Sequence, residues 1–233
     1  MNDRTQNFYD AKDRAYYAHA RTDITAMVRG RGLKVLEVGC GMGATLIELK
    51  RSGKAAVAVG VEINPEAVRE TRHLLDEVIV GNIENLELKY PGGYFDLIIL
   101  SDVLEHLVDP WGTLKKLKKH LTPEGRVIAS LPNLREFGTI RRLLFQGDFK
   151  YSEAGIMDKT HLRFFCRKNM VELFNDGFEI EEIKTIPKLL RGEVALFNRL
   201  TFRIFEEFLV IQYIIEARNK IIPGQAPEGG RNG

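Results

Sequence analysis

Cysteine, tryptophan and long apolar runs are all scarce in this chain of 233 residues. The two cysteines, Cys40 and Cys166, have no metal-ligand spacing and form no disulfide framework. No stretch approaches the roughly 18 consecutive apolar residues that a membrane-spanning helix needs, and the polar start has no apolar leader segment. We therefore expect a cytoplasmic protein without a membrane span.

An excess of charge of either sign is also lacking. The 34 lysines and arginines nearly balance the 32 aspartates and glutamates, and a net charge of +2 is too small to attract nucleic acid or lipid over the whole surface. The densest basic run, the lysines within residues 115–119, is interpreted as a solvated helix face. A composition that is 44% hydrophobic and 28% charged is typical of a folded globular domain.

The most informative stretch is a glycine-rich turn at residues 39–43. An apolar, β-branched run over residues 35–38 leads into the pattern G-x-G-x-G, and a helical pattern follows over residues 44–50. This order predicts a buried parallel strand, a tight turn and a helix N-terminus. Glycines suit such a turn because a Cβ would obstruct both the turn and the approach of a ligand to the backbone.

The identity of that ligand depends on Glu37, which stands shortly before the first glycine. Dinucleotide-binding folds usually show G-x-G-x-x-G, and a carboxylate here would repel a pyrophosphate. A positively charged ligand is favoured instead, and S-adenosylmethionine carries both an ammonium and a sulfonium group. The turn resembles motif I of the class I S-adenosylmethionine-dependent methyltransferases. An NAD-dependent enzyme is the disfavoured alternative at the level of the fold.

Two further stretches carry the same resemblance. D-V-L-E-H-L-V-D-P, residues 102–110, follows an apolar strand and closely matches the motif that these methyltransferases have after their fourth strand. D-K-T-H-L-R-F-F, residues 158–165, resembles a segment of methyltransferases that act on sugars and cell-surface glycans. The resemblance implies a Rossmann-like, doubly wound α/β sheet of seven strands, mostly parallel with an antiparallel last strand.

The domain organisation is predicted from the same comparison of patterns. We expect an N-terminal helical lid over residues 1–32, a methyltransferase domain over 33–220, and a Gly/Pro-rich disordered tail over 221–233. Between strand five and the next helix, residues 134–168 form an insertion over the acceptor pocket. Its eight basic and four acidic residues leave a local excess of +4. A second, amphipathic insertion at 189–209 is interpreted as a packing helix, with a membrane-surface or homodimer contact as alternatives.

The ends of the next two predicted strands supply further cofactor contacts. Glu62 ends an apolar strand 19 positions beyond Gly43, where a carboxylate can accept both hydroxyls of a ribose. In the resembling family, the third strand ends in an acid or amide that binds the adenine amino group, and Asn82 and Ile83 occupy this place and the next. In the resembling family an N-terminal helix covers the cofactor, which implies that Tyr17 and Arg21 of the lid face the ligand. The predicted cofactor site comprises Tyr17, Arg21, Glu37, Gly39, Cys40, Gly41, Gly43, Glu62, Ile63, Asn82, Ile83, Ser101 and Asp102.

The predicted reaction is the transfer of a methyl group to a hydroxyl of a small acceptor. Such an acceptor must lose its proton, and histidine, with an ordinary pKa near 6.5, is suited to take it. His106 is the first candidate for this base and His161 is the second. The basic insertion suits an acceptor that bears phosphate or carboxylate, and the resemblance suggests a sugar or phosphorylated sugar.

Three alternatives remain open at this level. Asp102, Glu105, His106 and His161 could hold a divalent metal ion, as the E-x-x-E-H site does in O-methyltransferases acting on quinone precursors and on RNA 3′ ends. We do not favour this metal. An RNA-end methyltransferase fits the basic insertion, although no RNA-binding extension is evident. A subunit that binds S-adenosylmethionine without transferring a methyl group is the alternative from another class.

Overall fold

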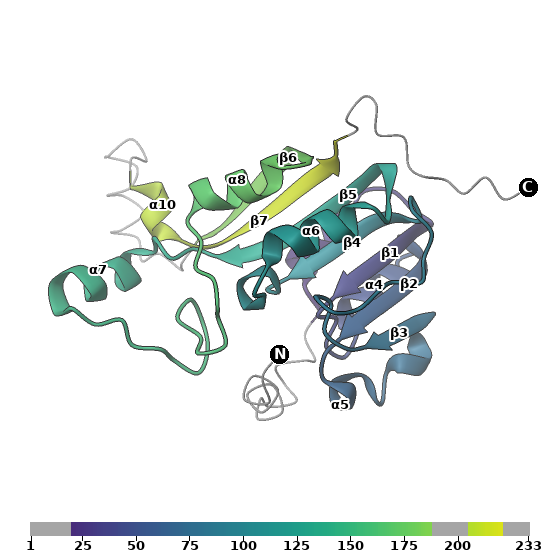
Figure 1. The fold of residues 1–233 in the computed structure, drawn as a ribbon, viewed down its shortest axis with the longest axis horizontal. Coiled ribbons are helices and arrows are strands. Elements are labelled where there is room, and N and C mark those ends of the chain that lie inside the picture. The colour runs from purple at the N-terminus through teal and green to yellow at the C-terminus, as the bar shows by residue number, and fades with distance from the viewer. Residues whose placement is uncertain (1–19, 188–204, 221–233) are drawn as a thin grey trace, which may run out of the picture.

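A seven-stranded mixed sheet lies at the centre of the computed structural model, which describes residues 20–187 and 205–220 (Figure 1). The strands are β1 (Leu33–Val38), β2 (Ala55–Glu62), β3 (Glu77–Val80), β4 (Phe95–Ser101), β5 (Leu121–Pro132), β6 (Phe178–Pro187) and β7 (Val210–Asn219). Their order in the sheet is β3-β2-β1-β4-β5-β7-β6. Strands β1 to β5 pair in parallel, and β7 runs antiparallel to both β5 and β6. This topology confirms the predicted fold class.

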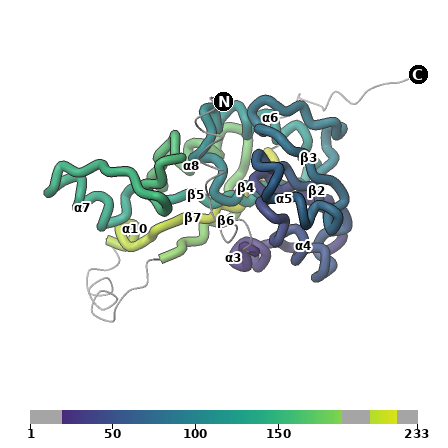
Figure 2. The backbone as a smooth tube through the Cα atoms, turned by 90° about the horizontal axis from the view of Figure 1, so that it is seen from below, coloured from purple at the N-terminus to yellow at the C-terminus, as the bar shows by residue number. Residues whose placement is uncertain are grey.

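Helices cover both faces of the sheet. The α-helices are α3 (Thr22–Thr25), α4 (Ala44–Arg51), α5 (Pro65–Val68), α6 (Pro110–Lys118), α7 (Phe137–Gln146), α8 (Arg167–Asn175) and α10 (Glu206–Leu209), and the 3-10 helices are η1 (Arg72–Leu74) and η2 (Leu104–His106). Figure 2 shows α6 and α8 on one side of the sheet and α3 and α4 on the other. Both faces of the central strands are therefore buried, which explains why these strands read as continuous apolar runs.

The alternation of side chains along β1 separates two hydrophobic cores. Leu36 and Val38 belong to the cluster that includes residues of α6 and α8, whereas Val35 belongs to the cluster that includes Leu46 of α4. Successive side chains of a strand point to opposite faces, so one buried strand contributes to both clusters. The carboxyl end of β1 is thereby held firmly between two packed layers.

The helix after β2, α5, is only four residues long. It starts where the side chain of Asn64 accepts a hydrogen bond from the backbone N–H of Glu66 and Pro65 occupies the first helical position. The helix ends at Val68, and η1 follows. Thr71 donates a hydrogen bond to the carbonyl oxygen of Met42, which draws the chain back toward the glycine turn.

Several predictions concern residues outside the described part of the chain. Tyr17 and most of the predicted lid lie there, as do the tail at 221–233 and most of the amphipathic stretch at 189–209. Within the described residues, no helix is long and apolar enough to cross a membrane.

Candidate active site

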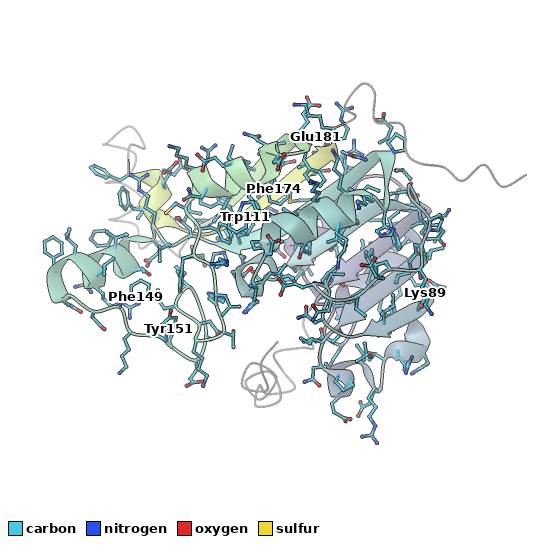
Figure 3. The ribbon with its side chains drawn as sticks, viewed as in Figure 1. Lys89, Trp111, Phe149, Tyr151, Phe174 and Glu181 are labelled. Carbon is cyan, nitrogen blue, oxygen red and sulfur yellow. The ribbon has the colours of Figure 1, made fainter. Side chains whose placement is uncertain are left out.

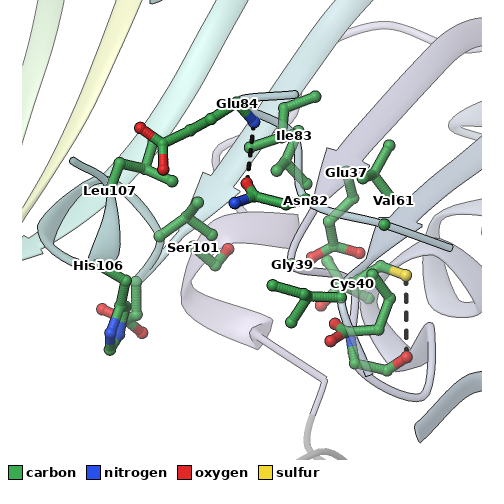
Figure 4. A pocket seen from close by; sticks show the side chains of 18 of the residues that line it. Glu37, Gly39, Cys40, Val61, Asn82, Ile83, Glu84, Ser101, His106 and Leu107 are labelled. Atoms are coloured by element: carbon green, nitrogen blue, oxygen red, sulfur yellow. Dashed lines mark hydrogen bonds between the residues drawn. The ribbon is translucent and has the colours of Figure 1, made fainter. Parts of the chain in front are cut away.

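A cavity opens at the carboxyl ends of β1, β2 and β4, where the strand order of the sheet reverses (Figure 4). In open α/β sheets, this reversal point is the usual place for a ligand. The cavity is lined by Arg21, Glu37, Val38, Gly39, Cys40, Gly41, Thr45, Val61, Glu62, Ile63, Gly81, Asn82, Ile83, Glu84, Ser101, Asp102, Val103, His106 and Leu107.

The glycine turn forms one wall of this cavity. Gly39 has a φ of +68°, and a Cβ at this residue would lie 2.7 Å from Cγ2 of Val103, so both the conformation and the space require glycine. The backbone N–H of Gly39 donates to the carbonyl oxygen of Val61 at 2.8 Å, which fastens the turn to β2. Gly43 is placed differently from the prediction: it caps α4 beside Leu75 and does not line the cavity.

Glu37 is a buried carboxylate whose hydrogen-bonding capacity is only partly satisfied by the protein. Its Oε2 atom has no hydrogen-bond partner among the described residues, and the side chain is 2% exposed. Burial raises the pKa of Glu37 to about 8, although a hydrogen bond with Thr45 and the positive charge of Arg21 oppose the rise. A buried acceptor without a donor fits a ligand that brings a cationic N–H group into the cavity.

Glu62 organises the turn as well as facing the cavity. Its Oε2 atom accepts the backbone N–H of Gly41 at 2.8 Å, and its Oε1 atom accepts the N–H of Asn64 at 2.9 Å. Burial raises the pKa of Glu62, and these hydrogen bonds oppose the rise. Each carboxylate oxygen retains a further lone pair, so the group can still accept hydroxyls from a ligand.

The far wall is formed by the turn after β3. Oδ1 of Asn82 accepts the backbone N–H of Glu84 at 2.9 Å (Figure 4). Lys116 of α6 holds this turn from behind, because its ammonium group donates to the carbonyl oxygens of Ile83, Glu84 and Leu86. The prediction of a wholly solvated lysine face is therefore wrong for Lys116, since the turn offers carbonyl oxygens that the strands leave unpaired.

Asp102 lies directly after β4 in a left-handed conformation, with a φ of +54°. Its carboxylate forms an ion pair with Arg21 and accepts hydrogen bonds from Ser130 and Gln212. The side chain of Asp102 is therefore already bound by three groups of the chain. A residue with φ above zero that is not glycine costs roughly 1 kcal/mol or more, so the surrounding contacts must hold this conformation.

His106 and His161 meet although 54 residues separate them. His106 lines the cavity, and the ring of His161 lies behind it at 4.7 Å between centroids, edge to face. Nδ1 of His106 lies 3.2 Å from the carbonyl oxygen of Thr160, and Nδ1 of His161 lies 3.0 Å from that of Ile156. Since a carbonyl oxygen only accepts, these contacts place the proton on Nδ1 and the lone pair on Nε2 in the neutral rings.

Glu105 completes a cluster with the two histidines. One ligand atom from each of Glu105, His106 and His161 lies within 4.8 Å of the others. Glu105 is 1% exposed, its Oε2 atom has no partner among the described residues, and burial together with the charge of Asp102 raises its pKa well above the ordinary value. Asp102, which the disfavoured metal alternative includes as a ligand, is not part of this cluster and binds Arg21.

Most of the predicted cofactor residues that the structure describes line the cavity, the exception being Gly43. Sequence reasoning missed the other lining residues, which are Val38, Thr45, Val61, Gly81, Glu84, Val103 and Leu107. Val103 and Leu107 lie within the 102–110 motif and could have been included on that ground. Thr45 gave a weaker signal, because it reads as an ordinary residue of the first turn of a helix.

Comparison with known proteins agrees with this arrangement. A family model described as a methyltransferase domain matches residues 9–183. A ubiquinone biosynthesis O-methyltransferase of Xanthomonas euvesicatoria pv. vesicatoria (strain 85-10) is 32% identical over 167 residues, which are 65% of this chain and 65% of that protein. Its counterpart in Xanthomonas axonopodis pv. citri (strain 306) is 29% identical over 175 residues, 69% of this chain and 68% of that protein. The chain thus spans less than two thirds of the first of these relatives.

Solved structures show the same fold at lower identity. A SAM-dependent methyltransferase from Archaeoglobus fulgidus superimposes with a TM-score of 0.62 and 19% identity, covering 89% of this chain and 95% of that one. The [4+2]-cyclase SpnF superimposes with a TM-score of 0.59 and 19% identity, covering 86% and 81%. Together, the sheet topology and the glycine-walled cavity define the class as Rossmann-like domains of the methyltransferase type. The chain belongs to the family of S-adenosylmethionine-dependent methyltransferase domains.

Proposed function

We propose that this chain methylates an oxygen atom of a small hydroxylated acceptor and uses S-adenosylmethionine as the methyl donor. The observation that carries the proposal is that three groups surround one cavity: the buried Glu37, whose Oε2 atom lacks a donor, the strand-end carboxylate of Glu62 and the base candidate His106. When bound, the cofactor supplies an electrophilic methyl group on a sulfonium ion.

The residues of the cavity fit this cofactor by charge and hydrogen bonding. Glu37 would accept the ammonium group, which supplies the donor that its Oε2 atom lacks. Glu62 would accept the ribose hydroxyls through its remaining lone pairs. Asn82 and Ile83 would contact the adenine ring.

His106 is proposed to accept the proton of the acceptor hydroxyl at Nε2. Its Nδ1 atom faces the carbonyl oxygen of Thr160, which fixes both the tautomer and the orientation of the ring. The segment that carries Thr160 is itself fastened to the site, because the N–H groups of Leu162 and Arg163 donate to the carbonyl oxygen of Glu105. These two backbone hydrogen bonds fix the segment that orients His106, and so they fix the position of the proposed base in the cavity.

The acceptor is proposed to be a sugar or phosphorylated sugar. The excess of basic residues over 134–168 supports an anionic acceptor. The names of the Xanthomonas relatives support O-methylation, and they also bring forward a phenolic quinone precursor as the second acceptor class. The fold does not distinguish a sugar acceptor from a quinone precursor, because proteins of this fold differ in their chemistry and one of them is a cyclase.

The first experiment is native mass spectrometry of the freshly purified chain, followed by calorimetric titration with S-adenosylmethionine, its demethylated product and NAD. We expect a copurified nucleoside of the first two kinds and no binding of NAD. Transfer of a labelled methyl group to a panel of sugar phosphates and catechols then tests the reaction. Binding of NAD, or cofactor binding without transfer to any member of the panel, would contradict the proposal.

A metal-assisted reaction is the second candidate, and the cluster of Glu105, His106 and His161 favours it. A divalent ion held there would lower the pKa of an acceptor hydroxyl and make a separate base unnecessary. The test is activity after chelation. Loss of turnover that magnesium or manganese restores would support this candidate, whereas full turnover in chelator would exclude it and leave His106 as the base.

A further inference from the structure

An arm formed by residues 137–151 follows β5 and projects beyond the carboxyl end of that strand (Figures 1 and 2). It consists of α7 and the segment that runs back from it. The helix is well built: the side chain of Glu136 accepts the N–H of Thr139 at its start, and Gly147 ends it in the left-handed conformation. Thr139 is the only buried residue of α7, so the helix leaves most of its surface uncovered.

The uncovered surface of the arm is apolar. Leu144 and Phe145 are 70% and 77% exposed, the highest exposures among the large hydrophobic side chains that the structure describes. Four more large apolar side chains of the arm are exposed: Phe137, Leu143, Phe149 and Tyr151. Single exposed apolar residues are ordinary, but a group of six on one projecting segment marks an interaction surface.

The charges of the arm are basic. The arm carries three basic residues, Arg141, Arg142 and Lys150, and one acidic residue, Asp148, so its net charge is +2. None of these four side chains forms an ion pair within the described residues. A second copy of the chain would bring like charges together across the contact, whereas an anionic surface would pair with them.

The apolar surface of the arm is continuous with the candidate active site. Phe149 contacts both Tyr151 and Phe164, with ring centroids 5.9 and 5.6 Å apart. Phe164 lies 6.3 Å from His161, which in turn contacts His106 on the cavity wall. Figure 3 shows Phe149 and Tyr151 on the segment that returns from α7 toward the body of the protein. A row of rings therefore leads from the exposed arm to the proposed base.

We propose that the 137–151 arm docks on an anionic lipid surface. A projecting helix whose exposed apolar side chains are accompanied by arginines fits the boundary between headgroups and acyl chains, where the apolar side chains insert and the cations pair with phosphates. Docking through the arm brings the row of rings, and with it the approach to the cavity, close to the lipid. Binding to lipid needs no methyl transfer, so it stands or falls independently of the proposed reaction.

The test is flotation of the full chain with vesicles of phosphatidylcholine, with and without phosphatidylglycerol. We expect binding to the anionic vesicles that weakens as salt is added. Replacing Leu144 and Phe145 together by glutamate should abolish it. Replacing Arg141 and Arg142 by glutamine should weaken binding about fivefold for each arginine.

Matched controls lie on the far side of the molecule. Leu74→Glu changes an exposed leucine of η1, and the pair Arg51→Gln and Arg69→Gln removes two exposed arginines elsewhere. All variants should retain cofactor binding, which shows that they are folded. Absence of binding to anionic vesicles would overturn the proposal. So would a concentration-dependent dimer, seen by analytical ultracentrifugation, that the glutamate variant dissociates, because the arm would then be a contact between copies.

Discussion

The guanidinium group of Arg21 forms an ion pair with the carboxylate of Asp102, although the two residues are 81 positions apart. The same guanidinium donates hydrogen bonds to Oγ of Ser130 and Oε1 of Gln212, both at 3.2 Å. One side chain of the N-terminal segment thus connects the ends of β4, β5 and β7. Because Arg21 and Asp102 also line the cavity, this connection couples the stability of the fold to the geometry of the site.

Replacing Arg21 by glutamine should therefore affect both stability and ligand binding. The pair is only partly buried, so we expect the free energy of unfolding to fall by about 1–3 kcal/mol rather than by the larger amount typical of a fully buried pair. The affinity for S-adenosylmethionine should fall about tenfold, since Asp102 is left without its cation beside the cavity. Urea denaturation and calorimetry measure the two effects. Arg69→Gln, which removes an exposed ion pair with Glu66, should cost less than about 1 kcal/mol, and an equal loss in both variants would contradict this prediction.

Glu62→Gln should weaken cofactor binding about 10- to 100-fold. The variant loses one of two acceptors for backbone N–H groups and changes the group that would hold the ribose. Calorimetric titration of the folded variant with S-adenosylmethionine measures the effect. Glu66→Gln, an exposed carboxylate on the neighbouring helix, serves as the control. Unchanged affinity in Glu62→Gln would remove this residue from the proposed cofactor site.

The affinity for S-adenosylmethionine should depend on pH through Glu37. Its pKa in the ligand-free protein is about 8, and a bound ammonium group favours the ionised carboxylate, so binding releases a proton below that pH. We expect the dissociation constant to rise as the pH falls from about 8 to 6, by up to about tenfold per unit. Calorimetry in buffers of different ionisation enthalpy counts the released protons. The dependence should be absent in Glu37→Gln, and its persistence there would assign it to another group.

The same shift predicts how pH affects the stability of the ligand-free protein. The unfolded chain loses the proton of Glu37 near pH 4.5, whereas the folded chain keeps it up to about pH 8. The folded state therefore binds more protons between these values, and this group lowers the free energy of unfolding as the pH rises through that window. Urea denaturation should give similar free energies of unfolding for the wild type and Glu37→Gln near pH 4.5, and the variant should become the more stable of the two as the pH rises toward 8. A wild type that becomes the more stable protein at high pH would contradict this prediction.

His106→Asn should lower kcat by about 10²- to 10⁴-fold, because a general base contributes a factor of that size. The dissociation constant for S-adenosylmethionine should change less than about threefold, since the base acts on the acceptor. Single-turnover methyl transfer and calorimetry separate the two quantities. His73→Asn on η1 controls for the loss of an exposed histidine. Wild-type turnover of His106→Asn would eliminate this residue as the base.

Gly39→Ala should destabilise the protein through both strain and a clash. Its φ of +68° disfavours any Cβ, and that Cβ would lie 2.7 Å from Val103. Gly32 has the same φ with nothing within 4 Å, so Gly32→Ala isolates the conformational part at about 1 kcal/mol. We expect Gly39→Ala to cost about 1–3 kcal/mol more. Adding Val103→Ala should recover part of the excess, and denaturation of the three variants checks this. Equal losses at Gly32 and Gly39 would show that the clash is relieved at no cost.

The sequence by itself determined the local elements and the places where they end. An apolar β-branched run followed by alternating glycines has few alternatives to a strand and a tight turn, and an Asn-Pro pair after β2 or an Asp-Pro pair before α6 starts a helix through local hydrogen bonds. Since parallel strands present their carboxyl ends at one edge, Glu37, Glu62 and Ser101 could be assigned to one site before any fold was known.

Only the tertiary structure decided which distant groups meet at that edge. The insertion of β7 between β5 and β6 places Gln212 beside Asp102, and the return of the chain after α7 places His161 behind His106. These contacts depend on non-local packing, which no short-range pattern encodes. Asp102 is an example of such a non-local contact. Its position in the 102–110 motif is compatible with a metal ligand, but in the fold its carboxylate binds the guanidinium of Arg21 and lies outside the cluster of Glu105, His106 and His161.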